Sequence, residues 1–162
     1  MADQDPLLTG ILDGWRRYND LLADALSPLS DEQLDLRIAQ HLRSIRELAT
    51  HLVGVRAGWF HRGLGEGGEE IAAIAQWQQT EQPPRSASEL VAGLGTTWRL
   101  IEDAVTRWTP EQLAEQIEVE RYGRRSTLTR PWVTWHVLEH DLHHGGELGY
   151  SLGMHNLAAP GV

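Results

Sequence analysis

The chain has 162 residues, of which 41% are hydrophobic, and this is enough for one domain with a sizeable core. Its formal net charge of -9 argues against nucleic acid as the main partner, because phosphate neutralisation requires a basic face. The chain contains no cysteine, which excludes a disulfide framework, a thiolate metal site and a cysteine nucleophile.

The sequence offers no signal for a membrane. It contains no run of 18 apolar residues, and residues 1–5 (MADQD) are polar and acidic. We therefore expect neither a signal peptide nor a membrane anchor, and we expect a cytoplasmic protein. No low-complexity tract or linker divides the chain, so residues 1–162 are predicted to form a single domain.

Two helices are predicted in the first half of the chain. The first runs from about Pro6 to Leu26, where apolar residues recur at intervals of three and four and a proline suits the first turn. The second begins at Ser44, because Ser44 and Glu47 have the spacing of a capping box, and it continues to the glycines that start at residue 63. His51 lies on the apolar face of this second helix.

The second half repeats this pattern after a long crossover. Residues 65–84 are rich in glycine and proline and are predicted to form the crossover, with a short helix around Ile71 to Trp77. A third helix opens at the capping box of Ser86, and a fourth runs from about Pro131 to Gly149. Short segments at 27–34 and 109–113, each followed by an extended-looking run, make the two halves similar. The sequence thus predicts an all-α, up-down four-helix bundle with a long crossover between helices two and three.

The fourth helix carries four of the eight histidines within residues 136–144. At about 100° per residue they share roughly one third of the helix circumference, together with a glutamate and two valines. Imidazoles that face a core without partners cost free energy, and a divalent metal is the partner that most simply satisfies them. The residues on this arc are Val133, His136, Val137, His140, His143, His144 and Glu147.

Spacing alone leaves two possible ligand pairs in the fourth helix. Residues four apart lie one turn above each other, so either His136 with His140 or His140 with His144 can grip one ion. His51 of the second helix is placed to complete a site of three histidines. Three protein ligands leave positions open, as is typical of a catalytic rather than a structural metal.

Other residues are expected to support this site. We expect Glu147 to accept a hydrogen bond from an imidazole, and His136 to hydrogen-bond a ligand or line the pocket. His143 is either a further residue of this kind or an exposed residue at the edge of the bundle. Trp59 and Trp135 are expected to line the pocket.

Two phrases of the sequence resemble a known family. Residues 47–55 (ELATHLVGV), followed by Trp59, and residues 140–148 (HDLHHGGEL) are similar to the second-helix and fourth-helix signatures of the DinB/YfiT-like metalloenzymes. The resemblance implies a DinB-like bundle in which His51, His140 and His144 bind a divalent metal. Zinc or nickel fits best, with manganese or iron as alternatives. The sequence departs from the family pattern at Gly145 and Glu147, where arginine and glutamine are frequent.

The resemblance also implies an activity. Characterised members resemble thiol-dependent S-transferases and isomerases that use mycothiol, bacillithiol or glutathione, and they often resemble homodimers. An open three-histidine metal suits this chemistry, because it can hold an external thiol as its thiolate. Arginines that could bind carboxylates of the thiol are Arg43, Arg46, Arg56 and Arg130.

We therefore expect a metal-dependent S-transferase that acts on a small-molecule thiol and an electrophile, and that forms a homodimer. Two alternatives use the same bundle. One is a non-catalytic protein of the stress response that binds a metal or a small ligand. The other is a hydrolase in which the same ion activates water.

Overall fold

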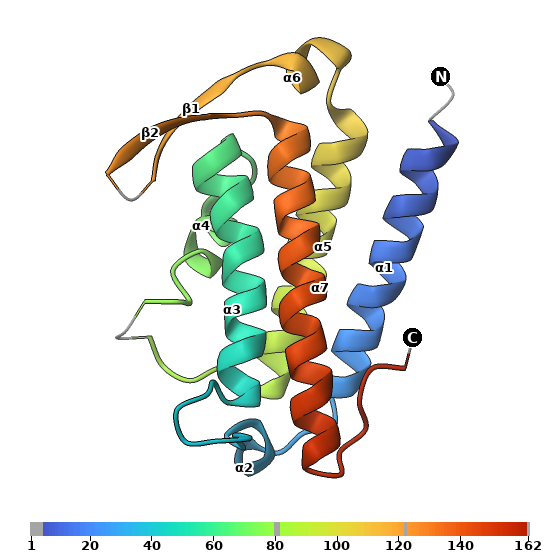
Figure 1. The fold of residues 1–162 in the computed structure, drawn as a ribbon, viewed down its shortest axis with the longest axis vertical. Helices are drawn as coiled ribbons and strands as arrows, with labels where there is room; N and C mark the ends of the chain where they lie inside the picture. The colour runs from blue at the N-terminus through green and yellow to red at the C-terminus, as the bar shows by residue number, and fades with distance from the viewer. Residues whose placement is uncertain (1–4, 80–81, 122, 162) are drawn as a thin grey trace.

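The computed structural model describes residues 5–79, 82–121 and 123–161. Four long helices lie alongside one another (Figure 1): α1 (Pro6–Leu26), α3 (Ile45–Gly58), α5 (Ala87–Arg107) and α7 (Arg130–Met154). The prediction of an all-α fold is confirmed. Among the described residues, none of the helices combines the length and the apolar character needed to cross a membrane.

Short elements connect the long helices. Between α1 and α5 lie α2 (Asp31–Leu34), the π-helix η1 (Trp59–Gly63) that continues α3, and α4 (Glu69–Ile74). After α5 come α6 (Pro110–Ala114) and the strands β1 (Ile117–Arg121) and β2 (Arg124–Leu128). The strands pair in antiparallel fashion, with Ile117 opposite Leu128. Their hairpin extends over the end of α3 and the start of α7 (Figure 1).

Several boundaries differ from those predicted from the sequence. α7 continues past Gly149 to Met154, because a single glycine inside a helix costs only about 1 kcal/mol. The crossover helix is found at Glu69–Ile74 rather than around residues 71–77. The similarity between the two halves is partial, because the described residues 35–44 contain no strand whereas Ile117–Arg121 and Arg124–Leu128 form a pair of strands.

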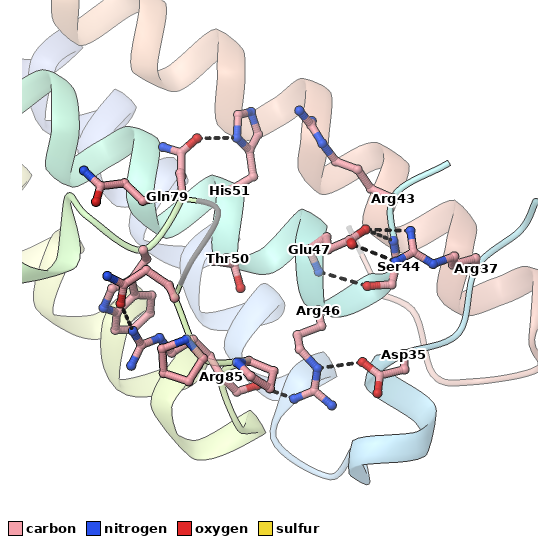
Figure 2. Close-up of a pocket in the computed structure, with 15 residues that line it drawn as sticks. Asp35, Arg37, Arg43, Ser44, Arg46, Glu47, Thr50, His51, Gln79 and Arg85 are labelled. Atoms are coloured by element: carbon pink, nitrogen blue, oxygen red, sulfur yellow. Dashed lines mark hydrogen bonds and ion pairs between the residues drawn. The ribbon is translucent and has the colours of Figure 1, made fainter. Parts of the chain in front are cut away.

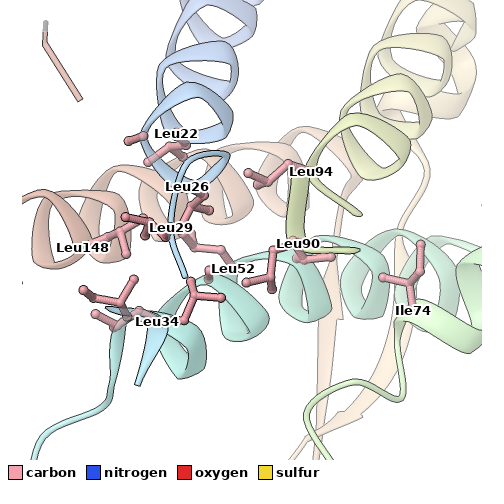
Figure 3. Packing of buried hydrophobic residues seen from close by; sticks show 14 of the residues in the cluster. Leu22, Leu26, Leu29, Leu34, Leu52, Ile74, Leu90, Leu94 and Leu148 are labelled. Carbon is pink, nitrogen blue, oxygen red and sulfur yellow. The ribbon is translucent and has the colours of Figure 1, made fainter. Parts of the chain in front are cut away.

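The core lies between the long helices and places α3 against α7. Leucines from α1, α3, α5 and α7 interdigitate at one end of the bundle (Figure 3), among them Leu26, Leu52, Leu90 and Leu148. Each fully buried leucine contributes roughly 1.5–3 kcal/mol through the apolar surface it removes from water. α3 packs against both α5 and α7, so the second and fourth long helices, which carry the predicted histidines, are neighbours.

A buried ion pair also ties α3 to α7. Arg56 and Asp141 both have fully buried side chains, and Arg56 Nε donates to Asp141 Oδ1 and Oδ2 at 3.0 and 2.9 Å. Trp15 Nε1 of α1 donates to Asp141 Oδ2 at 2.7 Å, and Arg56 Nη1 donates to Asn19 Oδ1 at 2.7 Å. The pair therefore holds three helices in one register.

Candidate metal centre

Three of the predicted residues, His51, His140 and His144, meet between α3 and α7. Each offers one ring nitrogen, and these nitrogens all lie within 4.8 Å of one another. The ring centroids of His140 and His144 are 4.3 Å apart, and Nε2 of His140 lies 3.1 Å from Nε2 of His51. All three residues are partly buried. Of the two pairs that spacing left open, the structure brings His140 and His144 to His51. His136 is outside the group.

Two of these imidazoles are oriented by hydrogen bonds through Nδ1. His144 Nδ1 donates to Glu147 Oε2 at 2.6 Å, because a carboxylate can only accept. His51 Nδ1 donates to Gln78 Oε1 at 2.7 Å. With the protons on Nδ1, the Nε2 lone pairs of both rings remain available to a metal. Glu147 takes the role expected for it, whereas Gln78, from the connection between α4 and α5, was not predicted.

The hydrogen bonds of His140 show whether the three histidines fit a metal ion. Its Nδ1 is buried and has no hydrogen-bond partner among the described residues. If Nε2 donates to His51, the Nδ1 lone pair is unpaired. If Nδ1 holds the proton instead, two Nε2 lone pairs face each other at 3.1 Å. A cation that accepts both lone pairs removes this second conflict, and three neutral imidazoles are a usual donor set for zinc. The residues therefore fit a divalent metal.

The protonation of the group also suits metal binding. Burial, followed by the neighbouring His144 and His51, lowers the pKa of His140 to about 3. Burial and then the positive charge of Arg43 lower the pKa of His51. Both rings are therefore neutral at neutral pH, as imidazole ligands must be.

The histidine-bearing arc of α7 is only partly buried, and of the two positions left open for His143 the structure has the exposed one. The side chain of His143 is 65% exposed, and Glu147 is exposed as well. The buried stripe of α7 instead recurs mainly every four residues, and His140 and His144 lie at its border. The stripe consists of Val133, Val137, Asp141, Gly145, Leu148, Ser151 and Leu152. His143, His144 and Glu147 form a second group of potential ligand atoms, which lies at the surface.

His136 and two tryptophans form an aromatic cluster next to the three-histidine group. His136 stacks on Trp132, with ring centroids 5.0 Å apart, and lies edge-on to Trp59 at 5.0 Å. Its ring centroid is 6.3 Å from that of His140. Trp59 also lines a cavity of about 460 Å³ under the hairpin. Trp135 is 58% exposed.

The structure distinguishes the four arginines that the sequence left open. Arg56 is buried against Asp141, Arg46 is paired with Asp35, and Arg130 is paired with Glu115. Arg43 is exposed and has no hydrogen-bonded or ion-paired partner in the part of the chain that the structure describes. Of the four arginines, only Arg43 is therefore available to bind a carboxylate of a ligand.

One departure from the family pattern has a structural counterpart. Gly145 lies on the buried stripe of α7, and a Cβ placed there would collide with the Tyr18 hydroxyl of α1. The tyrosine occupies the space that any larger residue at position 145 requires. The absence of an arginine at this position is thus coupled to the close approach of α1.

Comparisons with known proteins agree with this fold. The DinB family model matches residues 4–153. A DinB-like protein from Bacillus cereus superposes with a TM-score of 0.71 at 22% identity, and the match covers 95% of this chain and 96% of that one. A DinB-like protein from Bacillus subtilis has a TM-score of 0.67 at 17% identity, with 94% and 96% of the two chains covered.

A third structure, from Exiguobacterium sibiricum, is described as a member of the DinB family. It has a TM-score of 0.65 at 19% identity and covers 91% of this chain and 90% of its own. No curated protein matches the chain significantly. The family model spans nearly the whole sequence, and these structures share the fold over nine tenths of it. The chain therefore belongs to the DinB family.

Proposed function

We propose that the protein binds one divalent metal through His51, His140 and His144 and uses it as a thiol-dependent S-transferase. The observation that supports this most strongly is the 3.1 Å distance between Nε2 of His51 and Nε2 of His140, whose two lone pairs one cation can accept. A protein without cysteine must take its sulfur nucleophile from an external thiol. When bound, a divalent cation supplies Lewis acidity that favours the deprotonated form of such a thiol.

The residues of the chain have separate tasks in this proposal. His51, His140 and His144 hold the ion and leave positions open for a ligand. Gln78 and Glu147 hold two of the rings by their Nδ1 protons, which keeps the Nε2 atoms directed at the ion. The ion pair of Arg56 and Asp141 keeps α3 and α7 at the separation that the three rings require.

The proposed reaction is a displacement at an electrophilic carbon. The thiol loses its proton to solvent, and the sulfur electron pair forms the new bond to carbon. The bond from this carbon to the leaving group breaks, and the leaving group departs with the bonding electrons. The products are a thioether, the leaving group and one proton.

Metal binding is tested first. Protein loaded with zinc, nickel or manganese should contain about one ion per chain by elemental analysis. His140→Ala should lose the ion and His51→Ala should bind it more weakly, whereas the matched control His155→Ala, outside the group, should bind it unchanged. Full metal content in His140→Ala would show that the site is wrong.

Thiol chemistry is tested with the metal-loaded protein. It should accelerate conjugation of bacillithiol, mycothiol or glutathione to small electrophiles, and His140→Ala should abolish the acceleration. Calorimetry in buffers of different ionisation enthalpy should report about one proton released on thiol binding, since a free thiol has a pKa of about 8.5. Metal binding without thiol binding or turnover would leave a non-catalytic binding protein or a hydrolase.

A further inference from the structure

A cavity of about 640 Å³ lies beside His51. Its walls are the start of α3, the segment before α3 and the connection between α4 and α5 (Figure 2). A volume of this size is typical of sites for small molecules. In a chain with a net charge of -9 the charged lining is unusual, because cationic residues outnumber acidic ones. The charged lining residues are Arg37, Arg43, Arg46, Arg85, Asp35 and Glu47.

Both carboxylates of this cavity are already paired. Arg37 binds Glu47 with two hydrogen bonds of 2.7 Å, and Arg46 Nε donates to Asp35 at 2.7 Å. Arg85 is held mainly through Nη2, which donates to Gln82 at 2.9 Å, while its Nε is buried and has no hydrogen-bond partner among the described residues. Arg85 Nη1 also pairs with Glu89 at 3.3 Å. Among these four arginines, only Arg43 has no hydrogen-bonded or ion-paired partner in the part of the chain that the structure describes.

Arg43 shares the wall of the cavity with His51 of the three-histidine site. Figure 2 shows its guanidinium group extended along α3 toward His51. Arg43 borders the cavity, and His51 belongs to both the cavity and the three-histidine group. A molecule bound at the histidines can thus reach Arg43 through this cavity.

We propose that the cavity receives a carboxylate of the thiol, and that Arg43 is the specificity-determining residue that binds it. The inference rests on the proposed function, since it assigns the thiol a carboxylate in addition to its sulfur. A guanidinium presents donors in a planar fork that matches a carboxylate, and it stays charged at all relevant pH values. Arg43 gives up no other ion pair in order to bind.

The test compares two thiols that differ only in this group. N-acetylcysteine carries a carboxylate and N-acetylcysteamine does not. Both are titrated into the full chain loaded with cobalt(II), and binding is followed by the thiolate-to-cobalt charge-transfer absorption. We expect the wild type to prefer N-acetylcysteine about tenfold, as one charge-assisted hydrogen bond provides. Arg43→Gln should abolish the preference, and Arg17→Gln, on exposed α1 surface, should keep it. Added salt should reduce it.

Equal affinity of the wild type for the two thiols, or a full preference in Arg43→Gln, overturns the inference while thiol binding itself stands. If neither thiol produces the absorption band, the proposed function fails instead. Calorimetry with the sulfur-free probe N-acetylalanine then tests whether the cavity binds a carboxylate. Binding that is lost in Arg43→Gln supports a carboxylate site, and no binding to the wild type overturns it.

Discussion

The buried pair of Arg56 and Asp141 predicts a large and asymmetric response to mutation. Asp141→Ala leaves the fully buried Arg56 guanidinium without its counter-charge, and breaking such a pair costs about 3–5 kcal/mol. It also removes the acceptor of the Trp15 indole N–H, which alone costs about 1–3 kcal/mol. Because the two penalties overlap, we expect a loss of about 4 kcal/mol, a large share of the roughly 5–15 kcal/mol of a typical domain.

Removing both partners should cost less than removing one. Arg56→Met with Asp141→Leu replaces the pair by apolar side chains, and such replacements are often neutral. The groups that then lose a partner, on Trp15, Asn19 and the Leu94 carbonyl, are all neutral. We therefore expect the double variant to be at least about 2 kcal/mol more stable than Asp141→Ala. Urea unfolding measures the stability of both variants, provided that the m-values are unchanged. A loss below about 1 kcal/mol in Asp141→Ala, or a double variant no more stable than it, would refute the reasoning.

Three further predictions follow from the geometry. The folded-state pKa values of His51 and His140 lie below the unfolded value of about 6.5, so the unfolded chain binds more protons. In metal-free protein, the contribution of these two histidines to the free energy of unfolding should be complete above pH 6.5 and should be lost progressively toward pH 3. A melting temperature that does not fall between pH 7 and pH 5 would contradict this. Gly145→Ala should destabilise the protein by about 1–3 kcal/mol through overpacking against Tyr18, and Tyr18→Phe should restore part of the loss in thermal unfolding. The homodimer remains a prediction: exposed apolar residues on α7 such as Leu142 favour it, and light scattering that gives the mass of one chain at micromolar concentration would rule it out.

The helices were predictable wherever local signals agree with packing. The capping boxes at Ser44 and Ser86 start α3 and α5 as predicted. In each box the serine hydroxyl accepts a hydrogen bond from the backbone N–H three residues later, and the glutamate at that position accepts one from the backbone N–H of the serine. The same chemistry starts α2 at Ser30 and α6 at Thr109, with glutamine in place of glutamate. The helices that these two boxes open have only four and five residues, so a capping box indicates where a helix begins but not how long it is.

The residues of the site were predictable as a set, but the surroundings that orient them were not. The spacing of His140 and His144 is local and can be read directly, whereas the choice of this pair over His136 depended on family resemblance. Gln78 reaches His51 across 27 residues and through tertiary packing, so no spacing indicates it. Asp141 sits in the buried phase of α7, four residues after Val137, and that phase was the available signal for a buried charge.

The two helices that supply the histidines are far apart in the chain, since His51 and His140 are separated by 89 residues. An unfolded chain keeps only the neighbouring pair on α7. If the proposed cation binds, its affinity for the folded chain therefore exceeds its affinity for the unfolded chain by the contribution of His51. At a free cation concentration a hundred times the dissociation constant, this linkage stabilises the fold by up to about 2.7 kcal/mol. Closing this loop costs only about 0.6 kcal/mol more than closing one of half its length, because the entropy cost grows with the logarithm of the length. If the proposed cation binds, a shortage of it would leave the protein in a form that unfolds more often and is degraded faster by proteases.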